Sequence, residues 1–108
     1  MRFTGKKAAV LGLGRSGLAA ARGFREWGGE AVVFDRSSRD AVAKPEIADR
    51  ARSEGIDVVY GFDSVLPEGF DQLIVNPAVD RRHPLLADAV ARGIEVIGEI
   101  EFAFRIAR

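Results

Sequence analysis

Three glycines, Gly12, Gly14 and Gly17, directly follow a short apolar run at residues 8–11. This G-x-G-x-x-G spacing, between a strand and a helix, is typical of the phosphate-binding turn of nucleotide-binding βαβ units. The first glycine makes the tight turn, the second leaves room for a pyrophosphate, and the third lets the helix pack close to the strand. The unpaired N–H groups and the dipole of the helix's first turn then face the anion.

The next apolar run, at residues 30–34, is followed directly by an acid, Asp35. A carboxylate at this position accepts hydrogen bonds from a ribose hydroxyl or from an N–H of a base. Arg15 adds a cation and Ser16 a hydroxyl donor beside the expected phosphates. Arg36 adds a planar guanidinium, which stacks on a base or reaches a phosphate. The alternative for both arginines is a solvated surface position.

Apolar runs and helical patterns alternate along the chain and must position these groups. Strands are predicted at residues 6–11, 30–34, 57–60, 72–75 and 95–97, and helices at residues 15–27, 45–54, 84–92 and 99–106. Residues 36–44 and 61–71 are predicted to be irregular. This alternation predicts an α/β fold with right-handed crossovers, a Rossmann-like doubly wound parallel sheet of five strands in the order 3-2-1-4-5.

In such a sheet the ligand crevice lies at the carboxyl ends of the strands, where strands one and four diverge. Three loops far apart in sequence, at residues 12–17, 35–37 and 76–78, are therefore expected to line one crevice. Asn76 offers this crevice both a donor and an acceptor. Asparagine before proline also commonly begins a turn, so both interpretations of Asn76 stay open.

The remaining polar residues do not form a catalytic pattern. His83 is the only histidine and the chain has no cysteine, so neither a metal site nor a nucleophilic triad is predicted. His83 precedes Pro84 and is expected to order the start of a helix. Glu99 and Glu101 are expected to form a solvated first helical turn favoured by the helix dipole, rather than a catalytic pair.

Length and composition limit the class of protein. The 108 residues suit a single domain, residues 1–108, and 47% of them are hydrophobic, which argues against disorder. Sixteen basic residues balance sixteen acidic ones, which argues against a nucleic-acid or membrane-surface binder. The absence of cysteine fits a reducing compartment. No apolar run has membrane-spanning length and no signal-peptide core is present, so a cytoplasmic location is expected.

Five blocks of the sequence resemble, in order, the N-terminal domain of the Mur ligases, and of their D-glutamate-adding members above all. The blocks are residues 10–19, 33–35, 73–79, 83–86 and 93–102. The glycine motif is generic, but the later blocks at this spacing are more specific, and together they cover nearly the whole chain. The resemblance implies a Rossmann-like sheet that holds the UDP end of the peptidoglycan precursor UDP-N-acetylmuramoyl-L-alanine, rather than a dinucleotide.

The resemblance also implies roles for individual residues. Asp35 takes the position of the acid that holds the uracil. The turn that binds the diphosphate corresponds to Gly14, Arg15, Ser16 and Gly17.

Two further loops match the family with changes. Arg36 and Ser37 stand in place of a hydroxyl residue and an arginine that contact the base, here in reversed order. Asn76, Pro77 and Ala78 match a block that usually reads Ser-Pro-Gly, so Ala78 departs from the glycine. The resemblance assigns all five residues to substrate binding.

The catalytic parts of the family are not found in these residues. The family presents a Gly-Thr-Asn-Gly-Lys-Thr P-loop after its Glu-Ile-Glu block, and no such motif occurs in the 108 residues. The resemblance implies that the parent enzyme uses ATP and magnesium to phosphorylate a carboxylate, which the amine of D-glutamate then attacks. This chain is therefore expected to be a fragment that uses no cofactor and lacks the central and C-terminal ligase domains.

Two other interpretations remain open. An NAD-binding Rossmann domain, from a dehydrogenase or a ligand-sensing regulator, fits Gly12, Gly14, Gly17 and Asp35 equally well. An interaction domain without a ligand is the third, because a fold does not establish a ligand.

Overall fold

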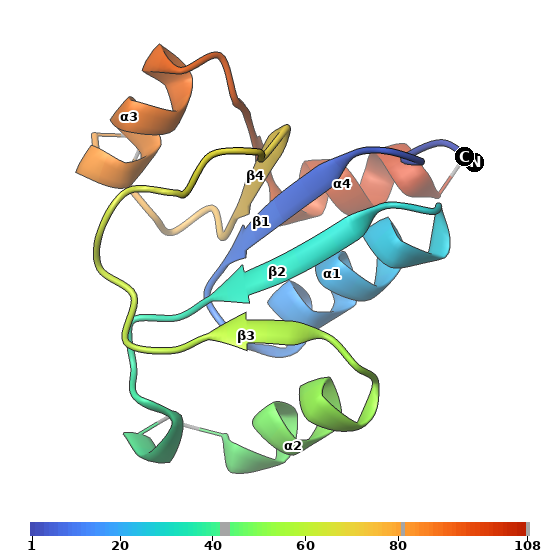
Figure 1. The fold of residues 1–108 in the computed structure, drawn as a ribbon, viewed down its shortest axis with the longest axis vertical. Coiled ribbons are helices and arrows are strands. Elements are labelled where there is room, and N and C mark those ends of the chain that lie inside the picture. The colour runs from blue at the N-terminus through green and yellow to red at the C-terminus, as the bar shows by residue number, and fades with distance from the viewer. Residues whose placement is uncertain (42–43, 81, 108) are drawn as a thin grey trace.

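The computed structural model describes residues 1–41, 44–80 and 82–107. Within these residues the chain forms a five-stranded parallel sheet in the order β3-β2-β1-β4-β5, as the sequence predicts (Figure 1). The strands are β1 (Lys7–Leu11), β2 (Glu30–Phe34), β3 (Asp57–Val59), β4 (Gln72–Val75) and β5 (Glu95–Gly98). The helices are α1 (Arg15–Glu26), α2 (Pro45–Ser53), α3 (Pro84–Ala91) and α4 (Glu99–Ile106), with a short 3-10 helix, η1 (Arg39–Ala41).

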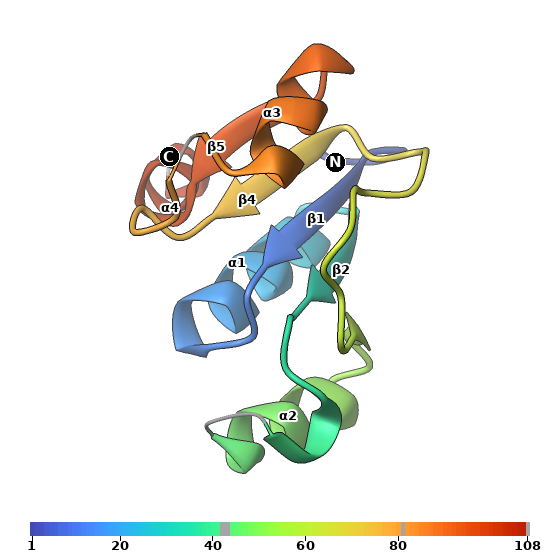
Figure 2. The same ribbon diagram turned by 90° about the vertical axis from the view of Figure 1, so that its left-hand side faces the viewer.

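Both faces of the sheet are covered by other elements. Successive side chains of each strand point to opposite faces, so each strand contributes to two core clusters. In β1, Ala8 and Val10 join a core with α1, α2 and α4, while Ala9 packs on the other face with α3 and the segment before β4. The central strand is fully buried from Ala8 to Val10, as expected for a parallel sheet covered on both sides. Figure 2 looks onto the carboxyl edge of the strands, with α3 on one side of the sheet and α1 on the other.

The turn from β1 into α1 depends on two glycines. Gly12 has φ +97°, a conformation that side-chain-bearing residues rarely adopt. A Cβ added at Gly17 would collide with the carbonyl oxygen of Gly12. The helix therefore approaches the strand as closely as the third glycine of the motif predicts.

The core beneath α1 includes a stack of phenylalanine rings. Phe3 and Phe24 lie with ring centroids 4.2 Å apart and nearly parallel, and Phe102 of α4 lies 5.9 Å from Phe3. Stacked aromatic pairs contribute beyond the area that they bury. This stack joins the N-terminal segment, α1 and α4, and both chain ends lie on that side of the molecule in Figure 1.

Most element boundaries agree with the predicted ones within one or two residues. The region predicted to be irregular after β2 contains η1, and residues 42 and 43 of that region lie outside the described residues. Arg22 and Glu26 have the spacing of a helical ion pair, but Arg22 instead forms a bidentate pair with Glu54, at 2.8 Å on each side. This pair joins α1 to the end of α2.

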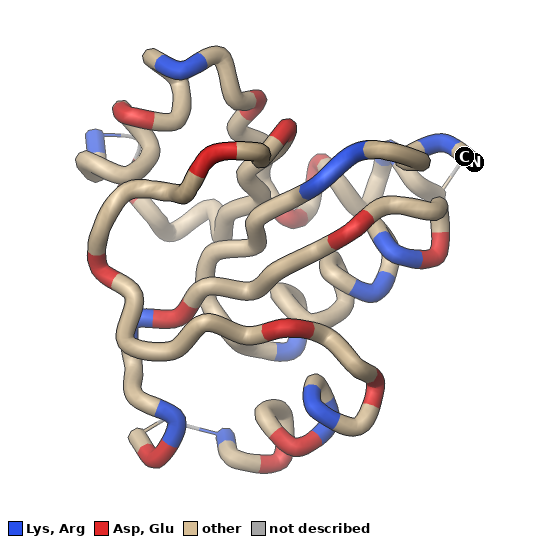
Figure 3. The backbone as a smooth tube through the Cα atoms, viewed as in Figure 1, with Lys and Arg blue, Asp and Glu red and all other residues tan. Residues whose placement is uncertain are grey.

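Charged residues of both signs are distributed along the backbone, as Figure 3 shows. Among the described residues, no helix combines the length and the apolar character that crossing a bilayer requires.

Candidate nucleotide-binding site

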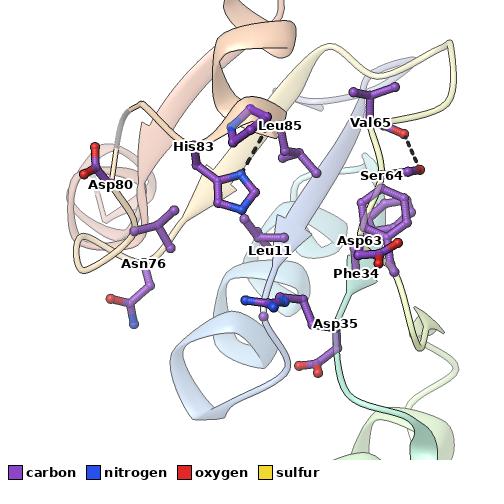
Figure 4. Close-up of a pocket in the computed structure, with 15 residues that line it drawn as sticks. Leu11, Phe34, Asp35, Asp63, Ser64, Val65, Asn76, Asp80, His83 and Leu85 are labelled. Carbon is purple, nitrogen blue, oxygen red and sulfur yellow. Dashed lines mark hydrogen bonds between the residues drawn. The ribbon is translucent and has the colours of Figure 1, made fainter.

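The carboxyl edge of the sheet carries a crevice of about 860 Å³, within the usual size range of ligand pockets. It lies between the ends of β1 and β2, the loop after β2, the segment that follows β3, and the start of α3 (Figure 4). The crevice is lined by Leu11, Gly12, Phe34, Asp35, Arg36, Phe62, Asp63, Ser64, Val65, Asn76, Val79, Asp80, His83, Pro84 and Leu85.

The floor of the crevice is apolar and its rim is acidic. Phe34 contacts Phe62 with ring centroids 4.6 Å apart, next to Leu11 at the end of β1. Among the described lining residues, three carboxylates oppose one guanidinium, that of Arg36. Such a crevice suits a flat, partly apolar group with hydrogen-bond donors at its edge, and disfavours an anion.

Asp35 joins two of the loops. Its Oδ2 accepts a hydrogen bond from the backbone N–H of Leu13 at 2.6 Å, and its Oδ1 accepts one from the N–H of Ser37 at 2.8 Å. A carboxylate has about four lone-pair sites, so each oxygen retains capacity for a further donor. Asp35 therefore organises the glycine turn and the loop after β2 while it lines the crevice.

The glycine turn stands beside the crevice. A Cβ added at Gly14 meets no atom within 4 Å, so the space next to this residue is open. The first hydrogen bond within α1 runs from Leu18 N–H to the Gly14 oxygen at 2.8 Å. The N–H groups of the three preceding residues thus have no acceptor within the helix. Arg15 and Ser16 are exposed at this helix start, which can receive an anion.

Asn76 begins a turn after β4. Its side-chain Oδ1 accepts a hydrogen bond from the N–H of Ala78 at 2.9 Å, so the turn interpretation is confirmed. The side-chain NH₂ group is the donor that Asn76 can offer to a ligand. Asn76 also lines both the crevice and a second cavity, described below.

His83 forms the N-cap of α3, as the sequence predicts. Its Nδ1 accepts a hydrogen bond from the N–H of Leu85 at 3.1 Å. In the neutral ring that accepts at Nδ1, the proton resides on Nε2. Figure 4 shows the ring between Leu85 and Leu11, on the wall of the crevice.

One rim acid carries its own counter-ion. Asp80 accepts hydrogen bonds from the side chain and the backbone N–H of Arg82, at 2.9 Å and 2.8 Å, and these bonds hold the pKa of Asp80 below its ordinary value. Within the part of the chain that the structure describes, no three acidic or imidazole side chains cluster as metal ligands would.

A second cavity, which we call the α1–α4 hollow, lies on the other face of the sheet edge and has a volume of about 550 Å³. One of its residues corrects a prediction, because Glu99 is buried, with 8% of its surface exposed, whereas Glu101 is exposed as expected. Tertiary packing of Phe102 against α1 turns the first residue of α4 inward. The α1–α4 hollow is lined by Ser16, Ala19, Ala20, Asn76, Pro77, Glu99, Ile100, Phe102, Ala103 and Ile106.

The predicted site residues lie in three places, and Asn76 belongs to two of them. Asp35, Arg36 and Asn76 line the crevice, and Ser16, Asn76 and Pro77 line the α1–α4 hollow. The others line neither cavity and belong to the connecting loops or the start of α1: Gly14, Arg15, Gly17, Ser37 and Ala78.

Sequence reasoning did not assign a site role to the wall formed by residues 62–65. The segment belongs to residues 61–71, which were predicted to be irregular, and within it Phe62 packs on Phe34. The available signal was topological, because a chain that leaves the carboxyl end of β3 must pass the same edge as the other site loops.

This sheet order, with a glycine turn after β1 and a crevice at the carboxyl edge, defines a Rossmann-like α/β domain, a class whose ligands bind at that edge. Residues 6–98 match the model of the family described as Mur ligase MurD-like, N-terminal domain. The chain therefore belongs to this family of Mur ligase domains.

Curated relatives agree with the family assignment. The chain is 34% identical over 106 residues to the UDP-N-acetylmuramoylalanine–D-glutamate ligase of Ligilactobacillus salivarius, covering 97% of this chain and 22% of the relative. It is 41% identical over 95 residues to the ligase of the same name from Synechococcus sp. strain JA-3-3Ab, covering 88% of this chain and 20% of the relative. The chain thus spans about a fifth of the length of these relatives.

Proposed function

We propose that this domain binds the UDP part of UDP-N-acetylmuramoyl-L-alanine, as the N-terminal domain of a cytoplasmic ligase that adds D-glutamate during peptidoglycan synthesis. The observation that carries the proposal is the meeting of Asp35, Arg36 and Asn76 in one crevice beside the glycine turn. The names of the relatives support the choice of ligand, since they are UDP-N-acetylmuramoylalanine–D-glutamate ligases.

The charges of the site suggest how the ligand is oriented. The acidic rim of the crevice disfavours the diphosphate, whereas Arg15 and the N–H groups at the start of α1 favour it. We therefore place the diphosphate on the turn formed by Gly14, Arg15, Ser16 and Gly17. The uracil and ribose then enter the crevice, whose apolar floor and carboxylates suit a planar base and hydroxyl donors.

Three loop residues complete the proposed contacts with the base and the phosphates. Asp35 accepts from the uracil N–H, using lone pairs that its two backbone bonds leave available. Arg36 lines the same crevice and stacks on the base or reaches the diphosphate. Ser37 supports this loop, since its N–H donates to Asp35.

The ligase reaction itself requires parts that these residues do not contain. We propose that the parent enzyme uses ATP and magnesium, bound by its other domains, to activate the substrate carboxylate for attack by D-glutamate. The 108 residues contain no P-loop motif. Supplied with ATP, magnesium, UDP-N-acetylmuramoyl-L-alanine and D-glutamate, they are expected to release no phosphate; turnover that copurifies with the protein would contradict the fragment interpretation.

Calorimetric titration of the domain with UDP, CDP and NADH tests the proposal. We expect UDP to bind more tightly than CDP, because cytosine has no N–H at the ring position where uracil offers one to Asp35. NADH is expected to bind more weakly than UDP. Tighter binding of NADH than of either nucleotide would favour an NAD-binding domain, and binding of none of the three would favour an interaction domain.

A further inference from the structure

We propose that His83 is a specificity-determining residue of the crevice, where its Nε2–H donates a hydrogen bond to a carbonyl oxygen of the bound uracil. This inference rests on the proposed function, because it assigns one more contact to the base of the same nucleotide.

The two ring nitrogens of His83 have different tasks. Nδ1 accepts a hydrogen bond from the backbone N–H of Leu85 at 3.1 Å, so this nitrogen carries no proton. The proton of the neutral ring therefore resides on Nε2, which becomes a hydrogen-bond donor. The bond that caps α3 thus also fixes which nitrogen can donate to a ligand.

The Nε2 atom is directed into the crevice. Figure 4 shows it on the side of the ring away from Leu85, toward Leu11 at the end of β1. Across residues 1–41, 44–80 and 82–107, no group accepts a hydrogen bond from Nε2. Asp80 interacts electrostatically with His83, but its carboxylate accepts hydrogen bonds from Arg82. The Nε2–H group is therefore available to a ligand that enters the crevice.

A uracil in the crevice needs donors of this kind. The base carries a carbonyl oxygen on each side of the N–H that we assign to Asp35. Both oxygens lose hydrogen bonds to water as the base enters the apolar part of the crevice, and an acceptor left unpaired there costs free energy. A donor on the wall of the crevice offsets this cost for one of the two oxygens.

His83 is better placed for this contact than two other uncharged donors that line the crevice. The hydroxyl of Ser64 donates to a backbone carbonyl oxygen at 3.4 Å. The amide of Asn76 lies where the crevice meets the α1–α4 hollow. The ring of His83 instead lies between Leu11 and Leu85 in Figure 4. Its N–H thus stands beside apolar side chains, where a hydrogen bond is stronger because water is excluded.

Asp35 and His83 together match one edge of uracil. The ionised carboxylate offers only acceptors, which suit the N–H of the base, and the Nε2–H offers a donor, which suits an adjacent carbonyl oxygen. A base that carries an amino group at that carbonyl position would set a donor against a donor. The pair therefore discriminates between bases by two separate contacts.

Calorimetric titration of the wild type and His83→Asn with UDP, 2-thio-UDP and 4-thio-UDP tests this proposal. Asparagine is a preferred N-cap, so the variant keeps the start of α3, but it places no polar atom at the position of Nε2. Each thio nucleotide replaces one of the two carbonyl oxygens by sulfur, which is a weaker hydrogen-bond acceptor. The two analogues therefore identify the oxygen that His83 contacts.

We expect His83→Asn to bind UDP about two- to tenfold more weakly than the wild type does, the usual contribution of one hydrogen bond. For one of the two thio nucleotides, this difference between the proteins should largely disappear. Unchanged UDP affinity in His83→Asn, or the same loss for all three nucleotides, would overturn the role of His83 while UDP binding stands. Failure of the wild type to bind UDP would overturn the proposed function as well.

A measurement on the wild type alone does not depend on how the variant folds. His83 is the only histidine of the 108 residues, so nitrogen NMR spectra of histidine-labelled protein report on this ring alone. Without ligand, the spectra should show the proton on Nε2. At saturating UDP, the Nε2–H signal should shift and exchange more slowly with water. A proton on Nδ1 in the free protein, or an Nε2–H signal that saturating UDP leaves unchanged, would overturn the assignment.

Discussion

The carboxylate of Asp35 accepts a hydrogen bond from the backbone N–H of Leu13 at 2.6 Å, across 22 positions of sequence. This bond fixes the glycine turn against the loop after β2, and a second bond from Ser37 orders that loop. The acid proposed to recognise the base thus also positions the phosphate turn. The two roles can be separated by measuring several nucleotides. Loss of loop order weakens the binding of every nucleotide, whereas loss of base recognition weakens the binding only of nucleotides whose base donates to Asp35.

Asp35→Ala is predicted to weaken UDP binding more than CDP binding. The wild-type protein should bind UDP roughly five- to a hundredfold more tightly than CDP. This ratio corresponds to about 1–3 kcal/mol, the cost of leaving a shielded hydrogen-bonding group unpaired. The variant should lose most of that preference. It should also lose some affinity for both nucleotides, because the bond to Leu13 is removed. Calorimetric titration of both proteins with both nucleotides gives the four affinities required.

Asp63→Ala is the control for this prediction. Asp63 lines the same crevice but is exposed. Asp63→Ala removes one negative charge from the crevice, as Asp35→Ala does. We expect it to preserve the preference for UDP over CDP. Equal preference for the two nucleotides in wild-type protein would contradict the assignment of Asp35 to the uracil.

Gly14→Val and Gly17→Val are predicted to fail in different ways. Open space surrounds the added side chain at Gly14, so the fold should persist while the branched side chain blocks the diphosphate and UDP binding is lost. At Gly17 the added atoms collide with the Gly12 carbonyl, so the domain should be destabilised by about 1–3 kcal/mol or more. Circular dichroism with urea denaturation, followed by titration, separates the two outcomes. Unchanged UDP affinity in folded Gly14→Val would refute the phosphate assignment.

The strands and their order were predictable because they depend on local patterns. Apolar runs of strand length, helical periodicity and the glycine stops are read directly from neighbouring residues, and the right-handed crossover rule converts them into a sheet order. The loops that gather at the carboxyl edge follow from that order. For this reason Asp35, Arg36 and Asn76 were correctly expected to share a crevice.

The burial of Glu99 and the pairing of Arg22 were not predictable, because both depend on how helices face each other. Arg22 has Glu26 at helical spacing, yet it binds Glu54, 32 positions away, since α1 passes beside the end of α2. Glu99 was expected to be solvated because the helix dipole favours an acid in the first turn of a helix. Phe102 sets the rotation of α4 by packing into the phenylalanine stack, which buries the glutamate.

His83→Ala is predicted to destabilise the domain by about 0.5–2 kcal/mol, the usual cost of removing an N-cap. The alanine leaves the N–H of Leu85 without its acceptor. His83→Asn is the matched variant, because asparagine is a preferred N-cap and should retain most of the stability. Urea denaturation of the three proteins measures the difference. Equal destabilisation by alanine and asparagine would show that the cap is not what His83 contributes to stability.

The ion pair between Arg22 and Glu54 predicts a pH dependence of stability that one variant should remove. The hydrogen bond from Arg22 lowers the pKa of Glu54 from its ordinary value of 4.5, and its charge adds to the effect. Because the folded-state pKa lies below the unfolded one, the pair stabilises the fold above about pH 4.5, and this contribution is lost as the pH falls through the folded-state pKa. The melting temperature of Glu54→Gln should therefore lie below that of the wild type at pH 6.5, with the difference shrinking toward pH 3.

Glu26→Gln serves as the control, since it removes an acid near Arg22 that forms no hydrogen bond with it among the described contacts. If the melting temperature of Glu26→Gln also fell below that of the wild type at pH 6.5, and this difference shrank equally toward pH 3, the pH dependence would arise from general surface charge and not from the bidentate pair.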